Sequence, residues 1–197
     1  MVLTDELLGP ILRDVSRSFY LTLRVLPASV RSQIALAYLL ARIADTIADT
    51  QLVPAEKRMQ KLRQFRARIR DEGAPPVDFT HLAREQGNEA ERVLLQHSSE
   101  AIVLLDKMEG ADRGQIQLVL ETITRGQELD LARFGDGREL KALETADDLD
   151  DYTYRVAGCV GEFWTHLTRA HCFANAEIDE QSFVQNSIRF GKGLQLV

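Results

Sequence analysis

The stretch "SQIALAYLLARIADTIADT", residues 32–50, decides how this chain folds. Its apolar residues recur at the spacing of a helix that is buried over most of its surface, so we predict a helix from about Val30 to Asp49. The same stretch carries Arg42, Asp45 and Asp49, which are costly to bury without partners. These charges need a physical reason.

The charged residues of this helix lie on one narrow line. At 100° per residue, Tyr38, Arg42, Asp45 and Asp49 fall within an arc of roughly 60°. Apolar residues fill the rest of the helix surface: Ile34, Leu36, Leu39, Leu40, Ile43 and Ile47. A water-facing helix usually has a wider polar face than this.

Besides a water-facing helix, an ion pair or a cation site could account for the line. Arg42 and Asp45 have the i,i+3 spacing of an ion pair, although buried pairs rarely stabilise a fold much. Alternatively, Asp45 and Asp49 line a cavity and hold divalent cations. Mg²⁺ suits such a pair, because it binds one or two carboxylates and takes its remaining ligands from water and phosphate.

Helical periodicity runs through the rest of the chain, and no segment shows the alternation of a strand. We therefore predict a single all-α domain over residues 1–197. Residues 16–26 are interpreted as a helix end and a loop, and residues 71–80 as a linker. The remaining predicted helices cover Asp5–Val15, the basic segment 53–73, Glu89–Lys107, Asp112–Phe134, Leu149–Phe173 and the residues from Asp179 onward.

Composition restricts the partners of the protein. The formal net charge of −6 and the pI near 5.3 argue against nucleic-acid binding. The cations of segment 53–73 could attract anionic lipid or diphosphate, but their spread favours a solvated helix face. No apolar run approaches the ~20 residues that span a bilayer, and the two cysteines have no zinc-site spacing. A cytoplasmic protein is the simplest interpretation, and contact with a membrane surface remains open.

A second distinctive stretch is "DDLDDYTYRVAGCVGEFW", residues 147–164. Its four aspartates could bind a metal, or they could lie at a helix N-terminus, where carboxylates are favourable. Gly158 and Gly161 each cost about 1 kcal/mol within a helix relative to alanine. Close packing of another helix, the more common cause, would justify that cost, and so would an elongated apolar ligand.

Four blocks together resemble the squalene/phytoene synthase family of head-to-head prenyl synthases: "SRSFYLTLRVLP" (16–27), "AYLLARIADTIAD" (37–49), "YTYRVAGCVGEFW" (152–164) and "GKGLQLV" (191–197). The order of the blocks and the distances between them also fit this family. The resemblance extends from about residue 14 to the end.

The resemblance implies a class I isoprenoid synthase fold, a helical bundle around a central cavity. It places Mg²⁺ on Asp45 and Asp49, a diphosphate contact on Arg42, and a part in the first half-reaction on Tyr152. All four are implied catalytic residues. The residues that it implies for substrate binding are Ser16, Arg17, Ser18, Phe19, Tyr38, Val156, Ala157, Gly158, Gly161 and Gln195.

The implied reaction is the head-to-head condensation of two prenyl diphosphates. We favour two farnesyl diphosphates, which give presqualene diphosphate and then squalene with NADPH as reductant. A phytoene or dehydrosqualene synthase is the alternative, as is a non-catalytic homologue that binds prenyl diphosphate. A water-insoluble product would make peripheral membrane contact useful for release.

One departure from the family pattern concerns the C-terminal end of the sequence. Family members carry a second aspartate motif, N-x-x-R-D-x-x-x-D, directly after the block that matches "GLQLV". The sequence ends before that motif. We therefore expect a C-terminally incomplete synthase domain, and we expect the 197-residue polypeptide alone to be inactive or nearly so.

Overall fold

The chain forms helices throughout the residues that the structure, a computed structural model, describes: 6–135 and 141–197. No strand occurs in these ranges, which confirms the all-α prediction. The helices are η1 Leu7–Ile11, α2 Leu12–Ser16, α3 Phe19–Val25, α4 Ala28–Asp49, α5 Ala55–Arg70, α6 Thr80–Glu85, α7 Glu89–Gln96, α8 Ser98–Asp106, α9 Gly110–Phe134, α10 Ala146–Thr153, η2 Tyr154–Gly158, α11 Cys159–His171 and α12 Glu180–Gln195; η1 and η2 are π-helical.

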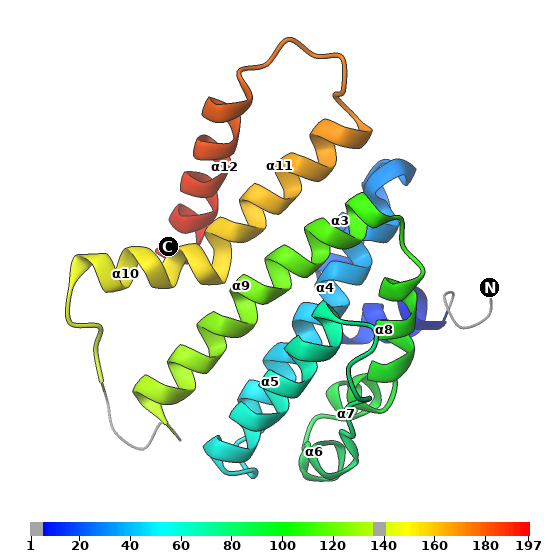
Figure 1. The fold of residues 1–197 in the computed structure, drawn as a ribbon, viewed down its shortest axis with the longest axis vertical. Coiled ribbons are helices and arrows are strands. Elements are labelled where there is room, and N and C mark those ends of the chain that lie inside the picture. Colours follow the sequence, from blue (N-terminus) through cyan, green and yellow to red (C-terminus); the bar gives the residue numbers. More distant parts are fainter. Residues whose placement is uncertain (1–5, 136–140) are drawn as a thin grey trace.

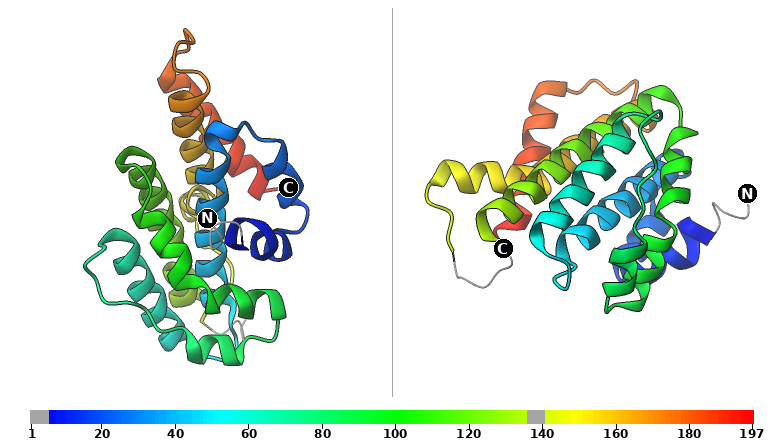
Figure 2. Two further views of the ribbon diagram at one scale, coloured as in Figure 1. Left: turned by 90° about the vertical axis from the view of Figure 1, so that its right-hand side faces the viewer. Right: turned by 60° about the horizontal axis from the view of Figure 1, so that its bottom comes forward.

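Helix α4 is the central element of the bundle. It contacts α5 and α9, α7 and α8, α11, and the N-terminal helices η1, α2 and α3. Helices α5 and α9 run beside it, while α12 packs along α11 (Figure 1). The two further views agree, with α4 in the interior and α6 to α8 covering one end (Figure 2).

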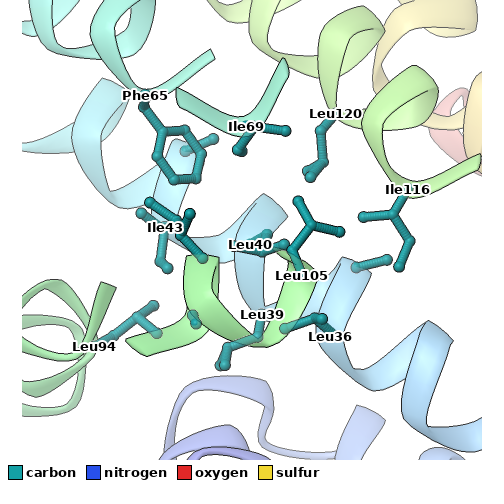
Figure 3. Packing of buried hydrophobic residues seen from close by; sticks show 14 of the residues in the cluster. Leu36, Leu39, Leu40, Ile43, Phe65, Ile69, Leu94, Leu105, Ile116 and Leu120 are labelled. Atoms are coloured by element: carbon teal, nitrogen blue, oxygen red, sulfur yellow. The ribbon is translucent and has the colours of Figure 1, made fainter. Parts of the chain in front are cut away.

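The apolar surface of α4 forms the middle of the core. Leu36, Leu39, Leu40 and Ile43 have no solvent exposure. Figure 3 shows these side chains meeting residues from α5, α7, α8 and α9: Phe65, Ile69, Leu94, Leu105, Ile116 and Leu120. Because α4 is enclosed on these sides, its polar line is held in a nearly fixed direction.

Residues 16–26 are mostly helical, so their interpretation as a helix end and a loop is wrong. Helix α3 follows a break at Arg17, whose φ of +50° ends α2. Leu23 anchors α3 in the core, and this burial outweighs the weak helix propensity of the segment. Helix α3 ends at Val25, because Leu26 precedes Pro27 and is extended.

The single helix predicted over Glu89–Lys107 is also wrong, because it breaks into α7 and α8 at His97. His97 has φ −100° and ψ 13°, and Ser98 donates a hydrogen bond to the carbonyl of Leu95. Both halves keep one apolar face toward α4, so the hydrophobic period passes through the break unchanged. Periodicity alone therefore gives no sign of it.

Three more predicted boundaries need smaller changes. Helix α6, which was not predicted, begins where the predicted linker ends, in a segment that carries no strong helical pattern. The N-terminal helix contains a π-helical turn around Pro10, and the predicted start at Asp5 lies outside the described residues. The helix predicted over Leu149–Phe173 is present but begins at Ala146 and includes the π-helical segment η2.

The cations of α5 mostly pair within the bundle. Arg66 pairs with Glu128 at 2.5 Å, and Arg68 pairs with Asp106 at 2.5 Å. These pairs connect α5 to α9 and α8, so the structure favours a structural use of the charges over a patch for lipid or diphosphate. Within the described ranges, no helix is both long enough and apolar enough to pass through a bilayer.

Candidate functional site

A cavity of about 460 Å³ lies between α4, α9 and the helical segment in which η2 continues into α11. Its volume is within the range of small-molecule sites. Three carboxylates line it, Asp45 and Asp49 from α4 and Asp130 from α9. The apolar part of the wall comes from Ala41, Ala48, Ile123, Leu131, Phe134, Val156 and Val160.

The Asp45 carboxylate is held from two sides. Gln127 of α9 donates a hydrogen bond from Nε2 to Oδ1 at 2.5 Å, and Arg42 approaches Oδ2 from Nη1 at 3.4 Å. Burial and the nearby charge of Asp49 raise the pKa of Asp45, against the opposing effects of Arg42 and Gln127. Burial is the largest of these effects. The partners of Asp45 therefore do not fully offset the cost of burying its negative charge, and the carboxylate faces the cavity.

Arg42 is engaged more strongly with Glu91 than with Asp45. Its Nη2 donates to Glu91 of α7 at 2.6 Å, and the two side chains are 25% and 22% exposed. Arg42 thus links α7 to the polar line of α4, and it does not line the cavity. A diphosphate contact by Arg42 would require its guanidinium to leave or share these carboxylates.

Asp49 is the exposed end of the polar line, at the last residue of α4. The helix end is fixed by Arg58, a buried residue that also lines the cavity. Its Nη1 donates to the carbonyl of Ala48, and its Nε donates to the carbonyl of Val53 at 2.9 Å. A cation at this position satisfies helix-terminal carbonyls and favours the helix dipole.

Asp130 lines the cavity from α9 and lies near Tyr152 of α10, which is not part of the cavity lining. Burial raises the pKa of Asp130. Burial and then the negative charge of Asp130 raise the pKa of Tyr152, which remains a neutral phenol at neutral pH. Val156, one turn further along the chain, lines the cavity. The structure thus places Val156 on the cavity wall, whereas Tyr152 lies outside the lining, near Asp130.

The block Ser16–Phe19 lies beside Tyr38, not on the wall of the cavity. The Phe19 and Tyr38 rings are 4.6 Å apart at their centroids, tilted by 31°. Burial raises the pKa of Tyr38, while the charge of Arg17 acts against this rise. Ser16 is buried and donates to the carbonyl of Leu12 at 2.5 Å, whereas Ser18 is exposed.

Gly158 and Gly161 face α12, in agreement with close helix packing. A Cβ on Gly161 would lie 2.2 Å from the carbonyl oxygen of Ser187, and one on Gly158 would lie 3.2 Å from the Lys192 side chain. Neither glycine lines the cavity. The backbone of Ala157 packs against Gly191, and Gln195 is exposed at the end of α12.

The aspartates of residues 147–151 lie in the first turns of α10. The cap is Thr145, whose side chain accepts a hydrogen bond from the backbone N–H of Asp148 at 3.0 Å. Asp148 pairs with Arg133, and Asp151 pairs with Arg155. Asp150 pairs with Lys192 at 2.7 Å. These contacts favour a structural role for the acidic stretch over a metal site.

Asp45 and Asp49 are the residues that could hold a hard cation at the cavity. Across the described ranges, no three His, Cys, Asp or Glu side chains gather closely enough to surround a metal by themselves. A cation here would complete its coordination from water or from a ligand, which is the usual behaviour of Mg²⁺.

Sequence reasoning missed Gln127, Asp130, Glu91 and Arg58. Gln127 and Asp130 are three residues apart on α9 and both line the cavity, so their spacing was a usable signal. Gln127 Oε1 is buried and has no hydrogen-bond partner within 6–135 and 141–197. An unsatisfied buried acceptor costs roughly 1–3 kcal/mol, so a ligand or water that donates to this oxygen would be favourable.

The fold and the cavity define an all-α protein of the class I isoprenoid synthase type. A solved structure of TcSQS with the ligand BPH1237 superposes with a TM-score of 0.76 over 99% of this chain and 52% of that chain, at 24% identity. A second, with the ligand E5700, gives a TM-score of 0.72 over 95% and 51%, at 25% identity.

The sequence pattern of the squalene/phytoene synthase family matches residues 12–197, and this chain belongs to that family. The squalene synthase of Solanum lycopersicum is 31% identical over 153 residues, which is 76% of this chain and 33% of that protein. The inactive squalene synthase 2 of Arabidopsis thaliana is 31% identical over 154 residues, 77% of this chain and 33% of that protein. The chain thus spans about a third of these relatives.

Proposed function

We propose that this chain is the part of a head-to-head prenyl synthase that carries its first aspartate pair, and that the enzyme condenses two farnesyl diphosphates to presqualene diphosphate and then to squalene. The observation that carries the proposal is the placing of Asp45 and Asp49, one turn apart, at a cavity with a partly apolar wall. The family membership and the squalene synthase relatives support the same chemistry.

The residues at the cavity fit Mg²⁺. Asp45 and Asp49 would hold it. The pKa of Asp45 is raised because the effects of burial and Asp49 exceed the opposing effects of Arg42 and Gln127, so a bound cation would stabilise its negative charge. Bound Mg²⁺ would neutralise the charge that develops on the departing diphosphate. The apolar wall, including Val156 and Val160, would keep water away from the allylic cation.

The acid–base side of the reaction falls to Tyr152 and Asp130 in this proposal. Formation of the cyclopropane ring releases one proton, which an acceptor must take. Burial raises the pKa of Asp130, so it is a better proton acceptor than an exposed aspartate, and it lies close to the neutral Tyr152 phenol. Tyr152 can also face a carbocation with its ring.

Product analysis tests the proposal. The purified synthase that contains this chain is incubated with Mg²⁺ and either C15 or C20 prenyl diphosphate, with and without NADPH. Presqualene diphosphate without NADPH and squalene with it are expected from the C15 substrate. A C40 product, or a C30 hydrocarbon formed equally well without reductant, would replace the squalene assignment by phytoene or dehydrosqualene synthesis.

A non-catalytic homologue that binds prenyl diphosphate is the second candidate, because a relative named as inactive is as similar as a relative named as a synthase. Asp45→Asn separates the two candidates. An enzyme should lose turnover by about 100-fold or more, as when positioned charge-stabilising groups are removed elsewhere. A non-catalytic homologue should show no turnover before or after the change, and the change should leave its non-catalytic role intact. Peripheral contact with a membrane, as an exit for squalene, belongs to the first candidate only.

A further inference from the structure

Gln127 has two features that ordinary helix packing does not explain. Its Nε2 donates to Asp45 Oδ1 at 2.5 Å, across the gap between α9 and α4. Its Oε1 is buried, lacks a hydrogen-bond partner in the described part of the chain, and belongs to a residue of the cavity wall. One end of the amide is therefore used on the carboxylate and the other end is open.

The neutrality of Gln127 suits this position. It lies on the same cavity wall as Asp130 and donates a hydrogen bond to Asp45, so it faces two carboxylates. An amide can donate to Asp45 without adding a negative charge to the cavity. Among the described residues, the contact to the second Asp45 oxygen, Oδ2, is the long one of 3.4 Å from Arg42.

We propose that Gln127 is a positioning residue for a hydrated divalent cation at Asp45: its Nε2 fixes the carboxylate, and its Oε1 accepts a hydrogen bond from a water molecule on the cation. The inference rests on the proposed function, since it needs a cation at Asp45. Partners that orient a metal-binding side chain commonly change metal affinity by about 10- to 100-fold. Mg²⁺ keeps several waters, and each water needs acceptors.

The test is the affinity of the purified protein for Mn²⁺, measured by electron paramagnetic resonance or calorimetry with and without inorganic diphosphate. The variants are Gln127→Leu and Gln127→Met, which remove both the donor and the open acceptor. Gln117→Leu is the matched control, because Gln117 is also a half-buried amide of α9 but donates to the carbonyl of Ile69, outside the cavity. Thermal unfolding of each variant establishes that it is folded.

We expect both Gln127 variants to bind Mn²⁺ about 10-fold or more weakly, and the Gln117 control to bind it as the unaltered protein does. In an Asp45→Asn background, the effect of Gln127→Leu should disappear because the two side chains act together. Unchanged Mn²⁺ affinity in both Gln127 variants, or an equal loss in the control, would overturn the role of Gln127.

The Asp45→Asn variant distinguishes this failure from failure of the proposed function. If Asp45→Asn abolishes Mn²⁺ binding while Gln127→Leu leaves it intact, the cation site stands and only the role of Gln127 is refuted. If the unaltered protein binds no Mn²⁺ even with diphosphate, or if Asp45→Asn has no effect on binding, the cation site and the role of Gln127 fall together.

Discussion

The substitution Gly161→Ala tests how α12 is held on the bundle. A Cβ at this position would lie 2.2 Å from the carbonyl oxygen of Ser187 and 2.8 Å from its carbonyl carbon. Both are backbone atoms of α12, so no side-chain rotation can relieve the clash. The helices must separate by roughly 1 Å to restore an ordinary contact distance.

The magnitude follows from two opposing effects. Overpacking costs about 1–3 kcal/mol, and the upper end applies where rigid backbone is the obstacle. Replacing a helical glycine with alanine returns about 1 kcal/mol through helix propensity. We therefore expect a net loss of about 2 kcal/mol in the free energy of unfolding. For a chain of this length, that lowers Tm by roughly 4–8 °C.

The assay is thermal and denaturant unfolding, with Gly193→Ala in α12 and Gly114→Ala in α9 as controls. Among the described residues, a Cβ at either control position would have no heavy atom within 4 Å beyond its chain neighbours and the backbone of its own helix. The same chemical change should therefore stabilise the protein there, by up to about 1 kcal/mol. A Gly161→Ala protein as stable as these controls would refute the packing of α12 described above, and would return Gly161 to the role of making room for a prenyl chain.

The remaining predictions concern stability. Arg58→Met should lower the free energy of unfolding by about 2 kcal/mol or more in denaturant titrations, because two backbone carbonyls lose a charged donor. Asp112→Ala should cost about 1–3 kcal/mol in the same titrations, since Gln33 and His171 both lose their acceptor; an unchanged midpoint would contradict this. Burial raises the pKa of Cys159 to about 12, so its contribution to stability should be full below about pH 9 and be lost as the pH rises toward 12; the free energy of unfolding measured from pH 8 to pH 11 should fall less steeply for Cys159→Ala.

The polar line of α4 could be predicted from the sequence because it is a property of one helix. The angular spacing of Tyr38, Arg42, Asp45 and Asp49 needs only the helical period, and the structure leaves each of them at least partly exposed while their apolar neighbours are buried. The all-α class followed from the same period, repeated along the chain. The helix break at His97 could not be predicted, because the hydrophobic period runs through it unchanged.

The partners of the line could not be predicted in the same way. Glu91 is 49 residues from Arg42 in the sequence, and Gln127 is 82 residues from Asp45. Each pairing depends on how α7 and α9 pack against α4, which is decided by core contacts that neither polar residue controls. The reason for Gly158 and Gly161 could not be predicted either. The sequence allowed close helix packing or an apolar ligand, and the position of α12 is needed to choose between them.

The connections of α4 explain why charged residues can be kept on so buried a helix. Asp45 is joined to α9 through Gln127 and to α7 through Arg42 and Glu91, so one carboxylate of α4 is tied to two neighbouring helices. The apolar residues on either side of the line are buried and fix the direction of α4, so these contacts stay in place. The proposed cation site would need its carboxylates held within about 0.5 Å, and a core helix meets this need better than a loop does. The cost of burying the charges is thus coupled to the rigidity that the proposed cation site would require. Under that proposal, changes that loosen the core beneath α4 should weaken cation binding without touching any residue of the cavity.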